Sequence, residues 1–456
     1  MAGWQNYLDE HRDRIFAEYL DLLRIPSIAT RPENAADVAR AGQWVASRLE
    51  SSGVESVEIL STDGHPVITG EWLHAPGRPT VLLYGHYDVQ PADPLELWES
   101  PPFEPTIRDG RVYARGASDM KGNLVAMIAG VEAILQTTGA LPVNIKFFIE
   151  GSEEIGSYGM PELLAANRER FAADLVVSAD SGQWSEDQPT ITHTWRGNVG
   201  AEIDLQGANS DLHSGVYGGA VQNALHAMVT LLASMRGPDG KILVEGFYDE
   251  VVQLSEADRA RIAAVPFDVD AYKRALGVDA LFGEAGFTPA EQLGIRPTLE
   301  VNGLWGGYQG EGRLMVLPNV AHAKISCRLV ANQDPDRILD LLERHVAEHC
   351  PPGVRATVTR GKNKARAYVL PIEHWGIQAV RDVLAGLYGK EPYFTRFGAS
   401  GGFLDMFLAG LGVHTVPFGF FLNDEQFHAP NEFFRLASFE RAKTGYALLL
   451  ERLGNH

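Results

Sequence analysis

The sequence predicts an α/β protein with a doubly wound, mostly parallel sheet and an inserted α+β domain. Residues 1 to about 195 alternate apolar strand-like runs with helical patterns, which is typical of helices packed on both faces of a sheet. After Trp195, the segment GNVGAEIDLQG alternates apolar and polar residues, which indicates an antiparallel strand with one wet face. From Ala365 the α/β pattern returns, including the apolar run Val413–Phe418.

The first part of the chain begins with a helical pattern and continues with four short apolar runs. The N-terminal pattern has no uninterrupted apolar core, so it predicts an amphipathic helix and not a signal peptide. Its apolar face consists of Trp4, Leu8, His11, Ile15 and Leu22. The strands expected in the main sheet are Val67–Trp72, Thr80–Gly85, Asn144–Glu150 and Asp174–Ala179.

The middle of the chain mixes helices with strands. Helices are expected over Gly219–Ser234, Tyr248–Leu276 and Pro335–His349, and strands over Leu314–Val316, Val320–Leu329 and Val354–Thr359. The polar segment that starts at Gly361 is expected to be a linker. The simplest organisation is a main domain formed by residues 1–196 and 363–456, with a domain of residues 197–362 inserted at an exposed loop.

Composition favours a soluble cytoplasmic protein. The 456 residues suggest roughly two or three domains, and 59 acidic against 39 basic residues argue against nucleic-acid or anionic-membrane partners. No apolar run approaches the roughly 18 residues that would suggest a membrane span. Cys327 and Cys350 form no disulfide framework and fit a reducing compartment, although the two could pair.

Ligand-type side chains stand at the ends of the expected strands. In an open α/β sheet, such strand ends converge on one site. Acids mixed with His, without Cys, indicate a hydrolytic metal centre better than a structural zinc site. The candidates in this first part of the chain are His86, Asp88, Asp119, Glu153, Glu154 and Asp180.

These residue types suggest roles. His86 is predicted to bind metal, and Asp88 to accept the other imidazole N–H and so orient the ring. Asp119, in the Gly-rich turn GASDMKG, could be a helix N-cap. Two metals about 3.5–4 Å apart need a bridging carboxylate, however, and Asp119 is the candidate. Asp180, in SADSG, completes an oxygen-rich set or is a simple turn residue.

The adjacent acids Glu153 and Glu154 follow FFIEGS, a segment too apolar for the surface. Two like charges there are costly unless a cation or a shared proton compensates them. One could bind metal while the other acts as general base on an activated water. A further ligand is expected from the last part of the chain, where His428 in NDEQFHAPNE is a better candidate than His414, which lies inside an apolar run.

Taken together, the motifs GHYDVQP, W-x-x-PPF-x-P, DGRVYARGASDMKG, GSEEIGS, SADS and QFHAPNE resemble the di-zinc exopeptidase family. That family includes carnosinase-type dipeptidases, glutamate carboxypeptidase, aminoacylase and succinyl-diaminopimelate desuccinylase. The resemblance covers nearly the whole chain. It implies a cis peptide after the bridging acid, and these assignments: His86 and Asp180 on one zinc, Glu154 and His428 on the other, Asp119 bridging, and Glu153 as general base.

Within this family, GHYDVQP, LHSGVYGG and SCRLVANQDP are most similar to the carnosinase-type, nonspecific dipeptidases. The resemblance implies that the inserted domain is a lid that mediates a homodimer, and that His213 polarises the scissile carbonyl in the partner's active site. It also implies that Arg328 and Ser400 bind the terminal carboxylate of the substrate. The dipeptidases have a threonine where this chain has Met315, which leaves the side-chain preference open.

The expected reaction is metal-dependent hydrolysis of the amide bond of dipeptides or similar small amides with a free C-terminal carboxylate. Zinc-activated water attacks, and Glu153 acts as base; manganese or cobalt could replace zinc. The alternative within the family is an N-acyl-amino-acid hydrolase or carboxypeptidase. A remote alternative is a serine hydrolase, because Gly398-Ala-Ser400-Gly-Gly402 fits a nucleophile elbow and Asp424 and His428 follow it. That alternative leaves the strand-end ligands unexplained.

Overall fold

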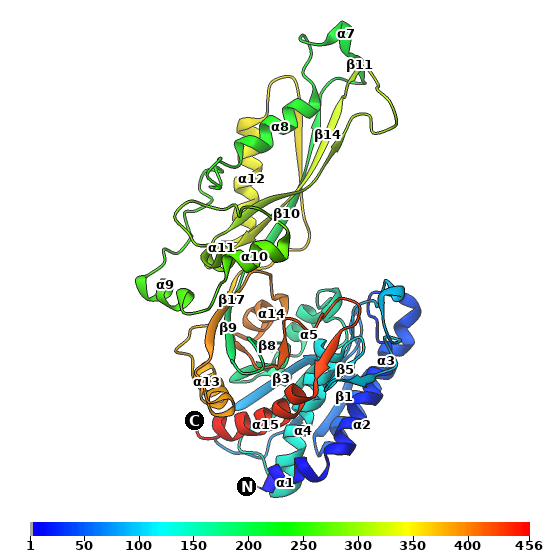
Figure 1. Ribbon diagram of the computed structural model, residues 1–456, viewed down its shortest axis with the longest axis vertical. Coiled ribbons are helices and arrows are strands. Elements are labelled where there is room, and N and C mark those ends of the chain that lie inside the picture. Colours follow the sequence, from blue (N-terminus) through cyan, green and yellow to red (C-terminus); the bar gives the residue numbers. More distant parts are fainter. Residues whose placement is uncertain (1–2) are drawn as a thin grey trace. The chain divides into compact units, whose positions relative to one another are not determined.

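The computed structural model describes residues 3–456, which divide by their contacts into two compact units (Figure 1). Unit 1 extends to His193 and also contains Leu370–Phe394 and Gly402–His456, whereas unit 2 consists of Thr194–Val369 and Thr395–Gly401. The segment Thr395–Gly401 groups with unit 2 because the Arg196 amide bonds to the carbonyls of Phe397 and Ala399. The expected segments 1–196, 197–362 and 363–456 place this loop in the main domain instead.

Unit 1 is built on a six-stranded sheet. The strand order is β1 (Glu55–Leu60), β2 (Val67–Trp72), β6 (Asn144–Glu150), β3 (Thr80–His86), β7 (Leu175–Ser178) and β18 (Thr415–Pro417). The four strands from β6 to β18 are parallel, and β1 and β2 are antiparallel additions at one edge. The predicted mostly parallel α/β fold is therefore confirmed.

Helices cover both faces of this sheet. Neighbouring residues of β3 point to opposite faces, and Leu83 lies among side chains of α4 (Gly122–Thr138) and α15 (Leu436–Leu453), which run beside each other in Figure 1. Tyr84 stacks on Phe403 of α14 (Gly402–Leu411), with a ring-centroid distance of 4.6 Å. Because both faces are covered, polar side chains of the inner strands can gather only at the strand ends.

Several further elements complete unit 1. The predicted N-terminal helix is divided into α1 (Gly3–Glu10) and α2 (Arg12–Leu23), which bury Trp4, Leu8, Ile15 and Leu22 as expected. The other helices are α3 (Ala35–Ser52), α5 (Met160–Ala166), α6 (Arg168–Phe171) and α13 (Trp375–Tyr388). Small sheets pair β4 (Thr106–Arg108) and β20 (Phe433–Arg435) with β5 (Arg111–Tyr113), and β8 (Gly182–Gln183) with β19 (Phe421–Leu422).

Unit 2 contains a four-stranded antiparallel sheet with helices on one face. The strand order is β12 (Thr298–Gly306), β14 (Val320–Leu329), β10 (Gly197–Gln206) and β15 (Arg355–Arg360). Alternate residues of β10, such as Val199 and Ile203, are buried in a core shared with α8 (Ala224–Ser234) and α12 (Pro335–His349). The expected α+β domain with one wet sheet face is therefore confirmed.

Two predicted helices of unit 2 differ from the structure. The helix expected from Gly219 begins at Ala224, because the Asn223 side chain accepts the first free amides as an N-cap. The stretch Tyr248–Leu276 forms two helices, α9 (Glu256–Ala263) and α10 (Val269–Leu276), because Pro266 cannot continue a helix. The other elements of unit 2 are α7 (Ser214–Tyr217), α11 (Pro289–Ile295), β11 (Leu212–His213) and β13 (Val316–Leu317). A further small sheet has the strand order β16 (Tyr368–Val369), β9 (Thr190–Trp195) and β17 (Tyr393–Phe397).

Two whole-chain features complete the description. From Gly3 to the C-terminus, no helix combines the length and apolar character needed to cross a membrane. Cys327 is buried and Cys350 is half-buried, and both are free thiols.

Candidate active site

The candidate ligands of unit 1 lie at the carboxyl edge of the parallel strands. His86 is the last residue of β3, Glu153 and Glu154 follow β6, and Asp180 follows β7. Because the carboxyl ends of parallel strands meet at one edge, the chain direction alone brings these side chains together. Asp119 reaches the same edge from the turn before α4, and His428 from the loop between β19 and β20.

Asp119 is at the centre of this group. Its Oδ1 lies 3.2 Å from Nε2 of His86, and its Oδ2 lies 2.9 Å from Nε2 of His428. His428 Nε2 is also 3.2 Å from Oε2 of Glu154. Two clusters could hold a metal ion, and they share Asp119: His86, Asp119 and Asp180 form one, and Asp119, Glu154 and His428 form the other, with the possible ligand atoms of each cluster within 4.8 Å of one another.

Asp88 is fully buried and contacts a residue of each cluster. Nδ1 of His86 is 3.1 Å from the main-chain oxygen of Asp88 and 3.4 Å from its Oδ1. The other carboxylate oxygen of Asp88 accepts the amide of Glu154, at 3.1 Å. Gln90 adds a donor from the same strand end, with Nε2 2.9 Å from Oε2 of Glu154. These contacts orient His86 and Glu154 toward Asp119.

The electrostatics of the cluster favour a cation. Burial and the nearby charge of Asp119 raise the pKa of Asp180 to about 7. The hydrogen bonds to Asp119 and Glu154 raise the pKa of His428 to about 10. Oε1 of Glu154 is buried without a hydrogen-bond partner. Carboxylates and imidazoles with an unsatisfied buried oxygen form a donor set that suits a pair of divalent metals, zinc among them.

Glu153 belongs to neither cluster of possible ligands, although it lies next to them. Burial, together with the negative charges of Asp180 and Glu154, raises the pKa of its carboxyl well above the usual range, against an opposing effect of His86. A carboxyl group whose charged form is destabilised in this way is suited to accept and return a proton. The structure therefore distinguishes the two adjacent acids, since Glu154 contacts His428 and Glu153 does not enter a ligand cluster.

A residue that the sequence reading missed holds the Asp119 turn in place. Glu432 is fully buried, and its carboxylate accepts the amides of Gly116, Ser118 and Asp119 at 2.9, 3.0 and 3.1 Å. The Glu432 carboxylate also accepts a hydrogen bond from NH1 of Arg115, at 2.7 Å. Glu432 lies in the same loop as His428, so one loop supplies a ligand and the anchor of the shared ligand's turn. Its sequence signal is the acid that ends the segment HAPNE.

The Asp119–Met120 peptide bond is cis. The prediction of a cis peptide at this position is therefore confirmed. The two residues on either side of the turn, Gly116 and Gly122, pack closely: a Cβ on Gly122 would lie 2.6 Å from the carbonyl oxygen of Ala117. This turn therefore has no room for a side chain at Gly122.

The predicted carboxylate-binding residues meet within unit 2. NH1 of Arg328, on β14, donates to the Ser400 hydroxyl at 2.8 Å. Ser400 lies in the segment Thr395–Gly401, just after the end of β17, and the backbone amide of Arg196 holds this segment through the carbonyls of Phe397 and Ala399. An arginine whose side-chain partner is a neutral hydroxyl keeps donors free for an anion.

His213 lies at an exposed position in unit 2. It is in β11, which pairs with β13 so that His213 is opposite Val316. Its Nδ1 accepts the amide of Gly215 at 3.1 Å, which leaves Nε2 as the outward nitrogen of the ring. Met315 is exposed, and its carbonyl accepts the amide of Ser214, the residue that follows His213.

The residues of the remote serine alternative serve other contacts. Asp424 pairs with Arg435 through two hydrogen bonds of 2.9 and 2.6 Å. No hydrogen bond joins Asp424 to His428 within residues 3–456, and Nε2 of His428 faces Asp119 and Glu154. A charge-relay pair between these two residues is therefore missing from the described chain.

Comparison with known proteins agrees with this geometry. Residues 82–452 match the model of peptidase family M20/M25/M40. The chain is 30% identical to a human Beta-Ala-His dipeptidase over 93% of its own length and 87% of the relative's. It is 28% identical to the Cys-Gly metallodipeptidase dug1 of Schizosaccharomyces pombe, over 86% of each chain.

A solved structure is similar along its whole length. The M20 family metallo-carboxypeptidase Sso-CP2 from Sulfolobus solfataricus superimposes with a TM-score of 0.82 at 30% identity, covering 97% of this chain and 99% of the other. Fold and site thus define a metallopeptidase. The chain belongs to peptidase family M20/M25/M40.

Proposed function

We propose that this metallopeptidase hydrolyses the amide bond of dipeptides, or of similar small amides with a free C-terminal carboxylate, and that its metals are two zinc ions. The observation that carries the proposal is the shared position of Asp119, whose two oxygens face His86 and His428 separately. A carboxylate placed in this way suits a bridge between two metals. The names of the two dipeptidase relatives support the substrate class.

The ligand roles follow from the two clusters. His86 and Asp180 would hold one metal, Glu154 and His428 the other, and Asp119 both. When bound, the metal pair supplies positive charge that acidifies a water and polarises the substrate carbonyl. Asp88 and Gln90 keep His86 and Glu154 in place through the contacts described above.

Glu153 is the proposed general base. Its carboxylate takes a proton from the attacking water as the new carbon–oxygen bond forms. It then delivers the proton to the amide nitrogen as the carbon–nitrogen bond breaks, which releases a free amine. Burial and the neighbouring acids hold the pKa of Glu153 above its usual range, which suits a group that must both accept and return a proton.

The substrate's terminal carboxylate is proposed to bind Arg328 and Ser400. NH1 of the Arg328 guanidinium donates a hydrogen bond to the Ser400 hydroxyl. Among the described residues, no carboxylate lies within salt-bridge distance of this guanidinium. A planar guanidinium beside a hydroxyl can hold a carboxylate through several donors. This contact would limit hydrolysis to the bond next to a C-terminal residue.

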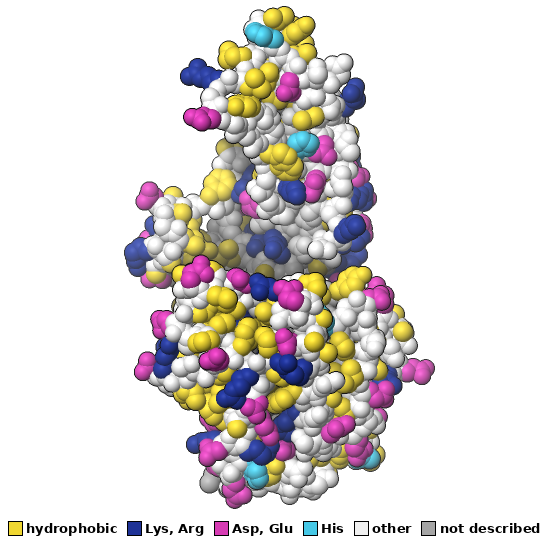
Figure 2. Space-filling model, turned by 90° about the vertical axis from the view of Figure 1, so that its right-hand side faces the viewer, with side chains coloured by type: hydrophobic (Ala, Val, Ile, Leu, Met, Phe, Trp, Pro, Cys, Tyr) yellow, Lys and Arg dark blue, Asp and Glu magenta, His cyan; other side chains and the backbone are white. Residues whose placement is uncertain are grey.

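We further propose a homodimer in which the second copy of the chain contributes its His213. Hydrophobic side chains gather at the end of unit 2 that carries α7 (Figure 2). Exposed apolar patches of this kind are typical of interfaces between proteins. The exposed large hydrophobic residues of α7, of α8 and of residues 304–315 are Val216, Tyr217, Val229, Leu304, Trp305, Tyr308, Leu314 and Met315.

A hydrolysis panel tests the proposal. The purified protein would be treated with a chelator and then assayed with zinc, manganese or cobalt added back. The panel contains α-dipeptides, β-alanyl dipeptides, N-acetyl amino acids, longer peptides and C-terminally amidated dipeptides. We expect metal-dependent cleavage of dipeptides and loss of cleavage on amidation, since the amide removes the charge that Arg328 binds.

Other results would change the conclusion. Faster cleavage of N-acetyl amino acids would indicate an N-acyl-amino-acid hydrolase, and faster cleavage of longer peptides would indicate a carboxypeptidase. Full activity in the presence of the chelator, with covalent labelling of Ser400 by a fluorophosphonate, would overturn the metal mechanism.

A further inference from the structure

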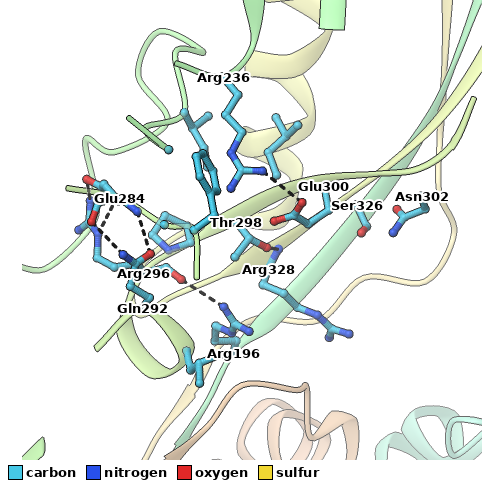
Figure 3. Close-up of a pocket in the computed structure, with 17 residues that line it drawn as sticks. Arg196, Arg236, Glu284, Gln292, Arg296, Thr298, Glu300, Asn302, Ser326 and Arg328 are labelled. Atoms are coloured by element: carbon cyan, nitrogen blue, oxygen red, sulfur yellow. Dashed lines mark hydrogen bonds and ion pairs between the residues drawn. The ribbon is translucent and has the colours of Figure 1, made fainter. Parts of the chain in front are cut away.

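A cavity of about 440 Å³ lies within unit 2 (Figure 3), and one of its lining residues is Arg328, which donates a hydrogen bond to Ser400. Its volume is in the range of small-molecule binding sites. Basic side chains are visible inside a hollow of unit 2 in Figure 2. The charged residues that line the cavity are four arginines and two glutamates: Arg196, Arg236, Arg296, Arg328, Glu284 and Glu300.

Two of the four arginines are already neutralised. Arg296 binds Glu284 through two hydrogen bonds, with Nε at 2.9 Å and NH2 at 2.7 Å. Arg236 pairs with Glu300 at 3.3 Å, and Figure 3 shows this pair in a part of the cavity away from Glu284 and Arg296. Both glutamates of the cavity are thereby used, and two positive charges remain without a carboxylate.

The remaining two are Arg196 and Arg328. Among residues 3–456, no carboxylate lies within 4.0 Å of either guanidinium, and the groups that accept hydrogen bonds from the two guanidiniums are neutral. Arg196 donates Nε to the carbonyl of Gly398 at 2.7 Å and NH1 to the carbonyl of Arg296 at 3.3 Å, while Arg328 donates to Ser400. A single substrate carboxylate at Arg328 would balance only one of the two charges.

The positive charge of Arg196 lies in an unfavourable environment. Arg196 is buried, and its burial together with the positive charge of Arg328 lowers its pKa to about 10. The guanidinium still carries its charge at neutral pH. A buried cation without an anion is unfavourable, and a bound anion would remove that penalty. The carbonyls of Gly398 and Arg296 fix the group in place, so its free donors are already oriented.

We propose that Arg196 is a specificity residue that binds an acidic side chain on the C-terminal residue of the substrate, while Arg328 and Ser400 bind the α-carboxylate of the same residue. This inference rests on the proposed function and narrows its substrate class to dipeptides that end in Asp or Glu. A neutral side chain leaves Arg196 uncompensated, and a basic one meets two like charges. The neutral polar groups Ser326, Asn302 and Thr298 line the same cavity and are compatible with a polar side chain.

Isosteric substrates test the inference without changing the protein. The kcat/KM values of Ala-Glu and Ala-Gln would be compared on the metal-loaded enzyme, and likewise those of Ala-Asp and Ala-Asn. Each pair differs in charge but hardly in shape. We expect the acidic member to be favoured at least about 10-fold, as a charged hydrogen bond to a buried partner allows. Equal values, or a preference for the amide, would overturn the inference.

Two variants of Arg196 and one control variant test whether Arg196 causes the preference for an acidic side chain. Arg196→Gln should bring the ratio of kcat/KM for Ala-Glu to that for Ala-Gln close to one, mainly by raising KM for Ala-Glu. Arg196→Lys keeps the charge and should retain part of the ratio. Arg337→Gln, which breaks an exposed ion pair with Asp249 and Glu250 elsewhere in unit 2, should leave the ratio unchanged.

The variant results have defined meanings. If Arg196→Gln lowers the values for Ala-Glu and Ala-Gln by the same factor, Arg196 only positions the Gly398–Ser400 loop and the inference is wrong. If the enzyme cleaves no dipeptide but hydrolyses N-acetyl amino acids, the proposed function fails first. Even then, N-acetyl-Glu against N-acetyl-Gln repeats the same test of Arg196.

A binding measurement gives a readout independent of turnover. Calorimetric titration with free L-glutamate and L-glutamine, the two leaving products, should show at least about 10-fold tighter binding of glutamate. Arg196→Gln should abolish that difference. Equal binding of the two amino acids to the unmodified protein would contradict the inference.

Discussion

The metal centre of unit 1 and the arginine cavity of unit 2 are both groups of like charges that the fold buries, but each is balanced differently. In unit 1, acids that follow two strand ends lie around Asp119, with only two histidines to offset them. In unit 2, the two glutamates of the cavity neutralise two arginines and leave Arg196 and Arg328 positive. The excess negative charge in unit 1 favours bound cations, and the excess positive charge in unit 2 favours a bound anion.

Each of the two regions also contains a buried side chain that supports the site. In both regions, a loop from a distant part of the chain completes the site. Glu432 joins the His428 loop to the Asp119 turn, and Arg196 joins the start of unit 2 to the Ser400 loop.

The largest effect is expected at the two adjacent acids of unit 1. Glu153→Ala should keep both metals but lower kcat by about 10²–10⁴-fold, because it removes proton transfer without removing a ligand. Glu154→Ala should lose metal as well, since Glu154 belongs to a ligand cluster. Metal content by mass spectrometry, measured with the kinetics, checks both. A metal-depleted Glu153→Ala beside a fully loaded Glu154→Ala would show that the roles are reversed.

Removing the anchor of the Asp119 turn should have a smaller effect, on metal affinity. Glu432→Gln replaces a carboxylate that accepts three backbone amides by a side-chain amide, in which one of the two polar groups is a donor. The metals should therefore bind about 10–100-fold more weakly. Turnover at saturating metal should change less than affinity does. Competition with a chromogenic chelator measures this change.

Controls for this prediction lie in the same region of the chain. Glu440→Gln removes a partly exposed carboxylate of α15 that pairs with Lys443, and it should leave the metal affinity unchanged. Glu432→Asp keeps the charge and should lose less affinity than Glu432→Gln. If Glu432→Gln folds normally and binds metal as tightly as the unmodified protein, Glu432 has no positioning role.

The proposed homodimer links the two regions and can be tested by mixing subunits. Homodimers of His213→Ala and of Glu153→Ala should both be nearly inactive. A heterodimer would contain one site with an intact Glu153 and an intact His213, so activity should return to about half of the unmodified value per heterodimer. Native mass spectrometry confirms subunit exchange. Exchange without restored activity would mean that His213 does not act across subunits.

The smallest effect concerns the stability of unit 2. His345 is buried beside Ser234 and stacks on His349, and burial together with the charge of His349 lowers its pKa to about 4. Because the folded pKa lies below the ordinary value of 6.5, the unfolded state binds the proton more tightly. The stabilisation is complete above pH 6.5 and is lost as the pH falls toward 4.

His345→Gln should remove this pH dependence. Between pH 6.5 and 4, the unmodified unit 2 should lose on the order of 2 kcal/mol more of its unfolding free energy than the variant does. Hydrogen exchange of α12 peptides reports on unit 2 separately from the metal centre. An identical pH dependence in both proteins would rule out His345 as the cause.

Much of the fold was predictable because it depends on short-range patterns. The runs Val67–Trp72 and Asn144–Glu150 match β2 and β6, and Pro335–His349 matches α12, since alternation and helical spacing are local properties. The predictions were poorer where a single cap or proline decided the boundary, as at Asn223 and Pro266. The functions proposed for individual site residues stay predictions.

The sequence by itself determined which ligand-type residues stand at strand ends, because strand direction and apolar runs are local and the carboxyl ends of parallel strands share an edge. Only the tertiary structure decided which oxygen of Asp119 faces which histidine and that Glu432 supports the turn. It alone also decided that no carboxylate of residues 3–456 pairs with Arg196 or Arg328. Those facts depend on distances between residues far apart in the chain, such as Asp119 and Glu432, and on which charges are already paired.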